Sequence, residues 1–115
     1  MWPQEAFATT LAVSNGLFGL QFLLIPKFFF SQFFFKELDE YHTFLSRFIG
    51  VLVLGQCALL KLCPAEDTFV PAALTQLAVA AVGPVYAQLN FETKPFHLFP
   101  VIAVCGTTAL ALLAL

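Results

Sequence analysis

Two histidines, His42 and His97, are the side chains in this chain of 115 residues that could take part in the most kinds of chemistry. An imidazole nitrogen can bind a metal ion, the magnesium of a chlorophyll or the iron of a haem. Side-chain amide oxygens can also coordinate a chlorin magnesium, and several amides lie within apolar stretches. The candidate pigment ligands are therefore His42, His97, Gln21, Gln56 and Gln88.

The sequence gives little support to other chemistry at these residues. Acids and histidines gather at 37–42 and 92–97, but no standard ligand spacing indicates a protein metal site. Ser46 and His42 are four residues apart, yet no motif of a nucleophilic hydrolase surrounds them. The three cysteines form no CxxC pair and are typical of small buried apolar residues. We therefore expect no metal and no catalytic residue.

The composition indicates that lipid surrounds much of the chain. Apolar residues make up 60% and charged residues 10%, and the mean hydropathy is +0.88. Soluble domains have about 45–50% apolar and about 25% charged residues. A domain of this size buries too little surface to hide such an excess of apolar residues. A net charge of −2 with scattered lysines argues against a nucleic-acid partner. We expect one integral membrane domain, residues 1–115.

Four stretches are long enough to cross a bilayer as helices, which takes roughly 20 apolar residues. The three short connections between them force consecutive helices to run antiparallel. The predicted fold is therefore an all-α, up-down four-helix bundle in a membrane. Pro84 predicts a kink of more than about 20° within the third span. The predicted spans are residues 6–26, 43–63, 69–90 and 95–115.

Polar and small residues inside the spans predict how the helices touch. An unpaired amide is costly in hydrocarbon, so Asn15, Gln76 and the three glutamines above should bond to another helix, a water or a ligand. Small residues let helix backbones approach closely, and they recur at every fourth position in three spans. These ridges are Ala8, Ala12 and Gly16, then Ser46 and Gly50, then Ala103, Thr107 and Ala111.

The segment 27–40, between the first two spans, combines aromatic and charged residues. It is too short to cross a membrane, and Lys27 and the acids after Lys36 keep both ends in water. The pattern predicts a short interfacial helix whose rings face lipid, a partner subunit or a pigment, and do not pack into the bundle. The rings are those of Phe28, Phe29, Phe30, Phe33, Phe34 and Phe35.

Basic residues predict an orientation. Lys27, Lys36, Lys94 and Arg47 lie near the first and third connections, whereas the opposite side has Lys61. The positive-inside rule then places loops 27–42 and 91–94 on the cytoplasmic, stromal or matrix side, with both termini opposite. The N-terminal sequence MWPQEAF lacks the positive charge of a signal peptide.

The layout of residues 11–115 resembles the small four-helix membrane proteins of the DoxX-like superfamily. The resemblance rests on a first helix that ends in LIPKFFF and on the segment ELDEYHTFLSRFIGVLVLGQ, which carries Arg47, Gly50 and Gly55. Members of that group mostly lack an assigned catalytic residue. The resemblance therefore implies a four-helix membrane fold and no particular reaction.

These features together favour a non-catalytic accessory subunit of a large bioenergetic membrane complex. A photosystem with its antenna, in a thylakoid membrane, is the first expectation, with chlorophyll, carotenoid or structural lipid packed against the rings and none of them required. A respiratory complex or ATP synthase of the mitochondrial inner membrane is the alternative. A freestanding small transporter is less favoured, because the first, third and fourth spans have no ionisable residue in their interiors. The expected partners are other membrane subunits and lipids.

Overall fold

The computed structural model describes residues 4–114, and these residues form helices and no β-strand. The first three residues of MWPQEAF, and Leu115 at the end of the predicted fourth span, lie outside the described residues. Residues 65–90 form one unbroken helix, which consists of the successive segments α4, η1 and α5. The elements are α1 (Gln4–Leu24), α2 (Pro26–Ser31), α3 (Glu40–Leu62), α4 (Ala65–Ala80), η1 (Ala81–Val85), α5 (Tyr86–Asn90), η2 (Pro95–His97) and α6 (Leu98–Ala114).

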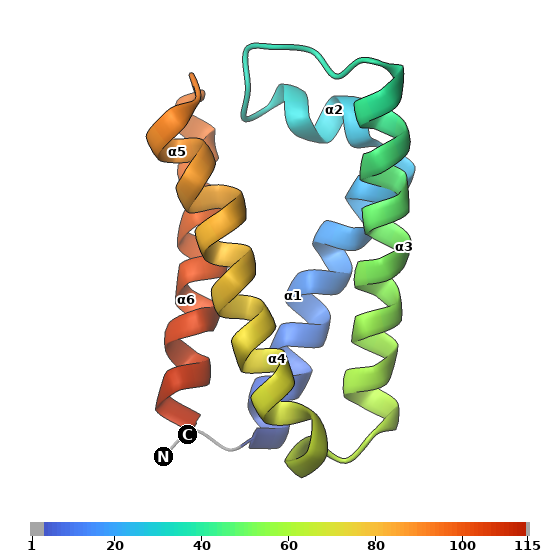
Figure 1. Ribbon diagram of the computed structural model, residues 1–115, viewed down its shortest axis with the longest axis vertical. Coiled ribbons are helices and arrows are strands. Elements are labelled where there is room, and N and C mark those ends of the chain that lie inside the picture. Colours follow the sequence, from blue (N-terminus) through green and yellow to red (C-terminus); the bar gives the residue numbers. More distant parts are fainter. Residues whose placement is uncertain (1–3, 115) are drawn as a thin grey trace.

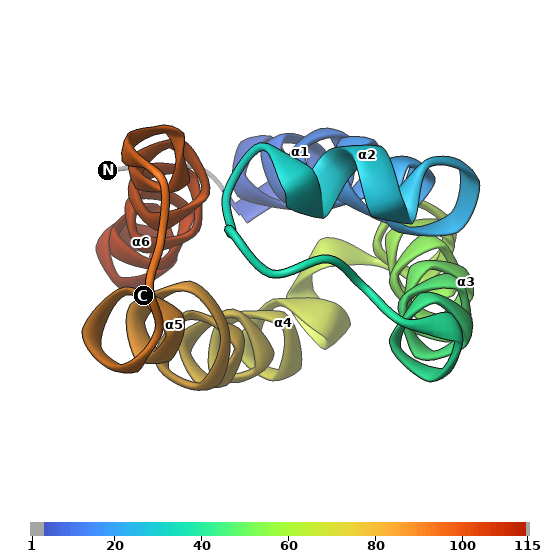
Figure 2. The same ribbon diagram turned by 90° about the horizontal axis from the view of Figure 1, so that it is seen from above.

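The four long helices lie side by side along the longest axis of the molecule (Figure 1). Seen from above, α1 and α3 form one pair and α4–α5 and α6 form the other (Figure 2). The short helix α2 lies across one end of the bundle, above α1, and the chain after it crosses the space between the two pairs before α3 begins. The start of α1 and the end of α6 lie at the opposite end.

The predicted helices are confirmed as helices, with ends that differ by a few residues. All four long helices are long and apolar enough to cross a membrane, as judged by length and composition. Much of the outer surface is also apolar, because large side chains such as Leu17, Phe48 and Ile102 lie exposed on three different helices. Such a surface is compatible with a lipid environment.

A buried hydrophobic core lies at the end of the bundle away from α2. The rings of Phe7 on α1 and Phe69 on α4 meet edge to face, with centroids 5.4 Å apart. All four long helices contribute to this cluster, so it joins the two pairs at this end. Its buried members are Phe7, Leu11, Leu60, Phe69, Ala72, Ala73 and Ala111.

The predicted small-residue ridges lie largely at helix contacts. Ala8, Ser46, Thr107 and Ala111 are buried, and Gly50 is buried against α1. A Cβ atom on Gly50 would lie 2.7 Å from the carbonyl oxygen of Gly19 and 2.9 Å from the nitrogen of Leu23. Glycine at position 50 therefore permits α1 and α3 to approach closely.

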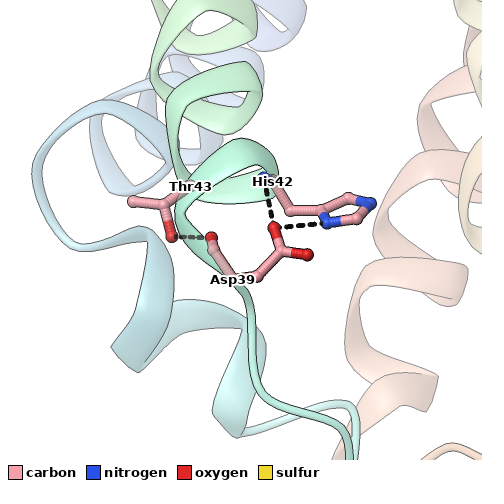
Figure 3. Close-up of polar contacts among 3 residues, drawn as sticks. All are labelled: Asp39, His42 and Thr43. Atoms are coloured by element: carbon pink, nitrogen blue, oxygen red, sulfur yellow. Dashed lines mark hydrogen bonds and ion pairs between the residues drawn. The ribbon is translucent and has the colours of Figure 1, made fainter.

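Asp39 determines where α3 begins (Figure 3). The backbone N–H of His42 donates to Asp39 Oδ1 at 2.8 Å, and His42 Nδ1 lies 2.7 Å from the same oxygen. The hydroxyl of Thr43 donates to the carbonyl oxygen of Asp39 at 2.7 Å. The backbone N–H of His42, as the largest cause, and the His42 side chain hold the pKa of Asp39 below its usual value. Asp39 is thus an N-cap of the kind that starts helices.

Pro84 lies in a π-helical turn, Ala81–Val85, in the C-terminal third of the third long helix. Proline has no N–H to donate to the preceding turn, and its ring crowds the carbonyl four residues earlier. The wider π turn accommodates both effects and lets the helix continue into α5. The predicted kink angle stays a prediction.

Candidate functional site

A cavity of about 390 Å³ lies between the two helix pairs, below α2. Its walls come from all four long helices, and its roof comes from α2 and the residues that follow it. Most of the lining side chains are aliphatic or aromatic, and four are polar. They are Asn15, Phe18, Phe22, Phe29, Phe30, Phe33, Phe34, Ser46, Ile49, Val53, Gln56, Val79, Val82, Gly83, Pro84, Tyr86, Ala87, Phe91, His97, Pro100 and Val104.

Phenylalanine rings packed on one another form the roof. Phe29 lies at the centre of this cluster, with ring centroids 4.8 Å from Phe33, 5.1 Å from Phe22 and 5.9 Å from Phe18, each pair edge to face. Phe30 stacks on Phe22 at 5.4 Å. Edge-to-face and offset arrangements are those that aromatic pairs prefer. The roof is therefore a packed aromatic layer that joins α2 to α1.

The prediction that the six rings of the segment stay out of the bundle is wrong for its central rings. Phe29 and Phe33 are 4% and 2% exposed, and Phe30 and Phe34 are half-buried. Phe28 and Phe35 are 61% and 65% exposed.

The reason lies in neighbours from elsewhere in the chain. A helix lying across the bundle end turns one side toward the long helices, and there Phe18, Phe22 and Phe96 meet the central rings. Phe18 and Phe22 are four residues apart on α1 and therefore lie on one face of that helix. This spacing was the one sign of the aromatic cluster in the sequence.

Lys94, in the connection between α5 and η2, holds the roof in place. Its backbone N–H donates to the carbonyl oxygen of Phe33 at 2.7 Å, and its ammonium donates to the carbonyl oxygen of Ser31 at 2.7 Å. The same ammonium lies 5.6 Å from the centroid of the Phe35 ring, a cation–π distance. The segment after α2 is thereby tied to the second helix pair.

A chain of polar side chains starts at Asn15, which lines the cavity, and continues among α1, α4 and α6. Asn15 Nδ2 donates to Gln76 Oε1 at 3.3 Å, and Gln76 Nε2 donates to the hydroxyl oxygen of Thr107 at 2.6 Å. Thr108 donates to the carbonyl oxygens of Val104, at 2.8 Å, and Gln76, at 3.4 Å. The prediction that Asn15 and Gln76 bond between helices is confirmed. Because these amides bond to protein groups, an occupant does not need to supply polar partners to them.

His97 is the one ionisable residue at the cavity that is fully buried among the described residues, with 3% exposure. Its Nδ1 lies 2.7 Å from Gln88 Oε1, while the Phe33 and Phe34 rings lie against the imidazole at centroid distances of 6.1 and 5.1 Å. With the Gln88 oxygen as acceptor, Nδ1 is the donor and Nε2 keeps the lone pair. His97 can therefore offer one nitrogen ligand or acceptor in apolar surroundings.

The structure brings some of the predicted ligands together and separates others. His97 and Gln88 are bonded, and Gln56 lines the same cavity from α3. Gln21 donates to the carbonyl oxygen of Leu17 on its own helix. His42 is exposed beside Asp39 and does not line the cavity. Among residues 4–114, no three histidine, cysteine or acidic side chains gather as a metal site. A role in pigment binding stays a prediction for all five.

The chain belongs to the family described as "Domain of unknown function (DUF8292)", whose model matches residues 9–114. No curated protein and no solved structure matches the chain. The resemblance to DoxX-like proteins stays a prediction.

Proposed function

We propose that this protein is an integral membrane protein that holds an apolar molecule in the cavity between its helix pairs. Its four long helices cross the bilayer in alternate directions, and α2 lies at the interface. The protein is a non-catalytic accessory subunit of a larger membrane complex, and the molecule it holds helps to pack that complex.

The observation that carries the proposal is the cavity itself. Its volume of about 390 Å³ falls in the range of small-molecule sites, which are mainly apolar with a few polar groups. A well-packed interior has few voids larger than a water molecule. An empty apolar space of this size would leave its walls without contacts, so an occupant stabilises the bundle.

Two classes of occupant suit these walls. Lipid acyl chains suit them because the aliphatic and aromatic side chains require no polar partner. A pigment suits them through His97, whose Nε2 could bind the magnesium of a chlorin, as expected for a subunit of a photosystem. The same purified sample distinguishes the two, because a pigment absorbs visible light and an acyl lipid does not.

The test is to purify the full chain from its membrane in mild detergent and to identify what remains bound. Organic extraction followed by mass spectrometry, with an absorbance spectrum of the same sample, should detect about one apolar molecule per chain. Val79→Trp should strongly reduce this occupancy, because Val79 lines the cavity and is 46% exposed, so the larger ring has room to enter.

The matched control is Val70→Trp on the same helix. Val70 is 52% exposed but does not line the cavity, so the substitution should leave the occupancy unchanged. Equal occupancy in wild type and in Val79→Trp would contradict the proposal. Native gels of the same preparations test the accessory role, because a subunit migrates with a large complex and a freestanding protein does not.

A further inference from the structure

A second pocket adjoins the apolar cavity and differs from it in chemistry. It has a volume of about 260 Å³ and lies between α2, the chain that follows α2, and the connection between α5 and η2. Three lysines and one glutamate contribute to it. Its lining residues are Lys27, Ser31, Phe34, Phe35, Lys36, Glu37, Leu38 and Lys94.

The pocket carries a net positive charge that the described protein does not neutralise by ion pairs. Within residues 4–114 the one ion pair joins His42 and Asp39, so Lys27, Lys36 and Lys94 have no carboxylate within ion-pair distance there. Glu37 is the single acid in the lining. The ammonium of Lys94 is fixed by the Ser31 carbonyl, while Lys27 and Lys36 are exposed. Such a pocket is complementary to an anion.

The two pockets share one wall. Phe34 lines both of them, and its ring also lies against Phe30 and His97 inside the apolar cavity. This side chain thus borders both the apolar cavity and the lysine-rich pocket. A single molecule with an anionic head and an apolar tail would match both the lysine-rich pocket and the apolar cavity beside it. A small anion would occupy the lysine-rich pocket alone.

We infer that the two pockets together bind one anionic phospholipid, with its phosphate among the three lysines and one acyl chain in the apolar cavity. This inference rests on the proposed function and names the occupant of the same cavity. This position is consistent with a membrane, because α2 and the connections that carry the lysines lie at one end of the long helices (Figure 1), where headgroups would be, and the cavity lies between helices. Basic pockets between membrane helices bind anionic headgroups in this way.

The test measures binding of two phospholipids with identical acyl chains by native mass spectrometry of the full chain in detergent. Phosphatidylglycerol carries a net negative charge and phosphatidylcholine does not. Wild-type protein should prefer phosphatidylglycerol by more than about tenfold, because each lysine near an anionic headgroup contributes roughly a fivefold preference. The variant with both Lys27→Gln and Lys36→Gln should lose most of that preference. Lys94 is left unchanged, because its ammonium also holds the roof.

Two controls separate the headgroup from other effects. Lys61→Gln removes an exposed lysine at the end of α3 that does not line the pocket, so the preference should remain. Glycerol 3-phosphate, which has the phosphate but no acyl chain, should not displace the bound lipid. Displacement by it would overturn the inference in favour of a site for a soluble phosphate.

The remaining outcomes distinguish this inference from the proposed function. Equal binding of both lipids to wild type, or an unchanged preference after the two lysine substitutions, would overturn the inference. If Val79→Trp still reduced the binding of both lipids, the proposed function would stand. If Val79→Trp left both lipids bound, the cavity would not be the site, and the two claims would fail together.

Discussion

At the scale of single residues, the closest approach of α1 and α3 depends on the absence of one side chain. A Cβ atom at position 50 would meet the backbone of Gly19 and Leu23, which cannot move without separating the helices. We predict that Gly50→Ala lowers the free energy of unfolding by about 1–3 kcal/mol, the usual cost of overpacking. Unfolding in mixed detergent micelles measures this.

Gly55 provides the matched control on the same helix. A Cβ atom there meets nothing within 4 Å, so Gly55→Ala should be neutral or stabilising by up to about 1 kcal/mol through helix propensity. Equal effects of the two substitutions would show that the α1–α3 contact does not depend on Gly50.

The cap of α3 makes a pH-dependent contribution. The bonds from His42 lower the pKa of Asp39, so the capping stabilisation is fully present above the unfolded value of about 3.9 and is lost as the pH falls through the lower folded pKa. We predict that the protection of the His42 amide against hydrogen exchange, corrected for intrinsic rate, falls below about pH 3.9.

Two variants separate the charge of Asp39 from its shape. Asp39→Asn can still cap α3, but it does not titrate. In this variant the protection of the His42 amide against hydrogen exchange should not change over this range of pH. Asp39→Ala should show low protection throughout. Protection that is independent of pH in the wild-type protein would contradict the assignment of Asp39 as the cap.

At the scale of elements, the segment formed by α2 and the residues that follow it has buried and exposed phenylalanines. Phe29 and Phe33 are buried against α1 and η2. Phe28 and Phe35 are exposed, and the Phe35 ring lies beside the ammonium of Lys94. We predict that Phe29→Ala or Phe33→Ala lowers the free energy of unfolding by about 3 kcal/mol or more, the usual cost of removing a buried ring. Phe28→Ala should change it by less than about 0.5 kcal/mol, and Phe35→Ala, which also removes the cation–π contact with Lys94, by less than about 1 kcal/mol.

Unfolding in mixed micelles, followed by circular dichroism, compares the four variants directly. If all four had the same small effect, the rings would all face outward, and the packed roof would be absent in solution.

The sequence was sufficient to predict the elements, but it predicted only part of their packing. Four apolar stretches and a short aromatic segment were evident, because the bilayer sets a minimum length and charged residues or prolines interrupt the runs. Which rings of the segment turn inward was not evident, because the partners Phe18, Phe22 and Phe96 come from other elements. The bond between Gln88 and His97 was missed for the same reason, although both had been singled out.

At the scale of the whole molecule, the packing is uneven along the bundle axis. The end away from α2 is closed by a core from all four helices, whereas the other end holds a partly open cavity below its aromatic roof. Composition and periodicity predict helices and an apolar face, but they do not reveal that two helix pairs separate at one end. The cavity therefore emerged from the structure alone, and the proposed function depends on it.

The most direct test of that proposal is a nuclear Overhauser measurement on full-length protein with labelled phenylalanines, purified from its membrane in deuterated detergent. Phe30 and Phe34 line the cavity, while Phe44 and Phe48 face outward. We predict cross-peaks between the Phe30 and Phe34 rings and protons of a retained apolar molecule, and their loss in Val79→Trp but not in Val70→Trp. Cross-peaks confined to the outward rings of Phe44 and Phe48 would contradict an occupied cavity and with it the proposed function.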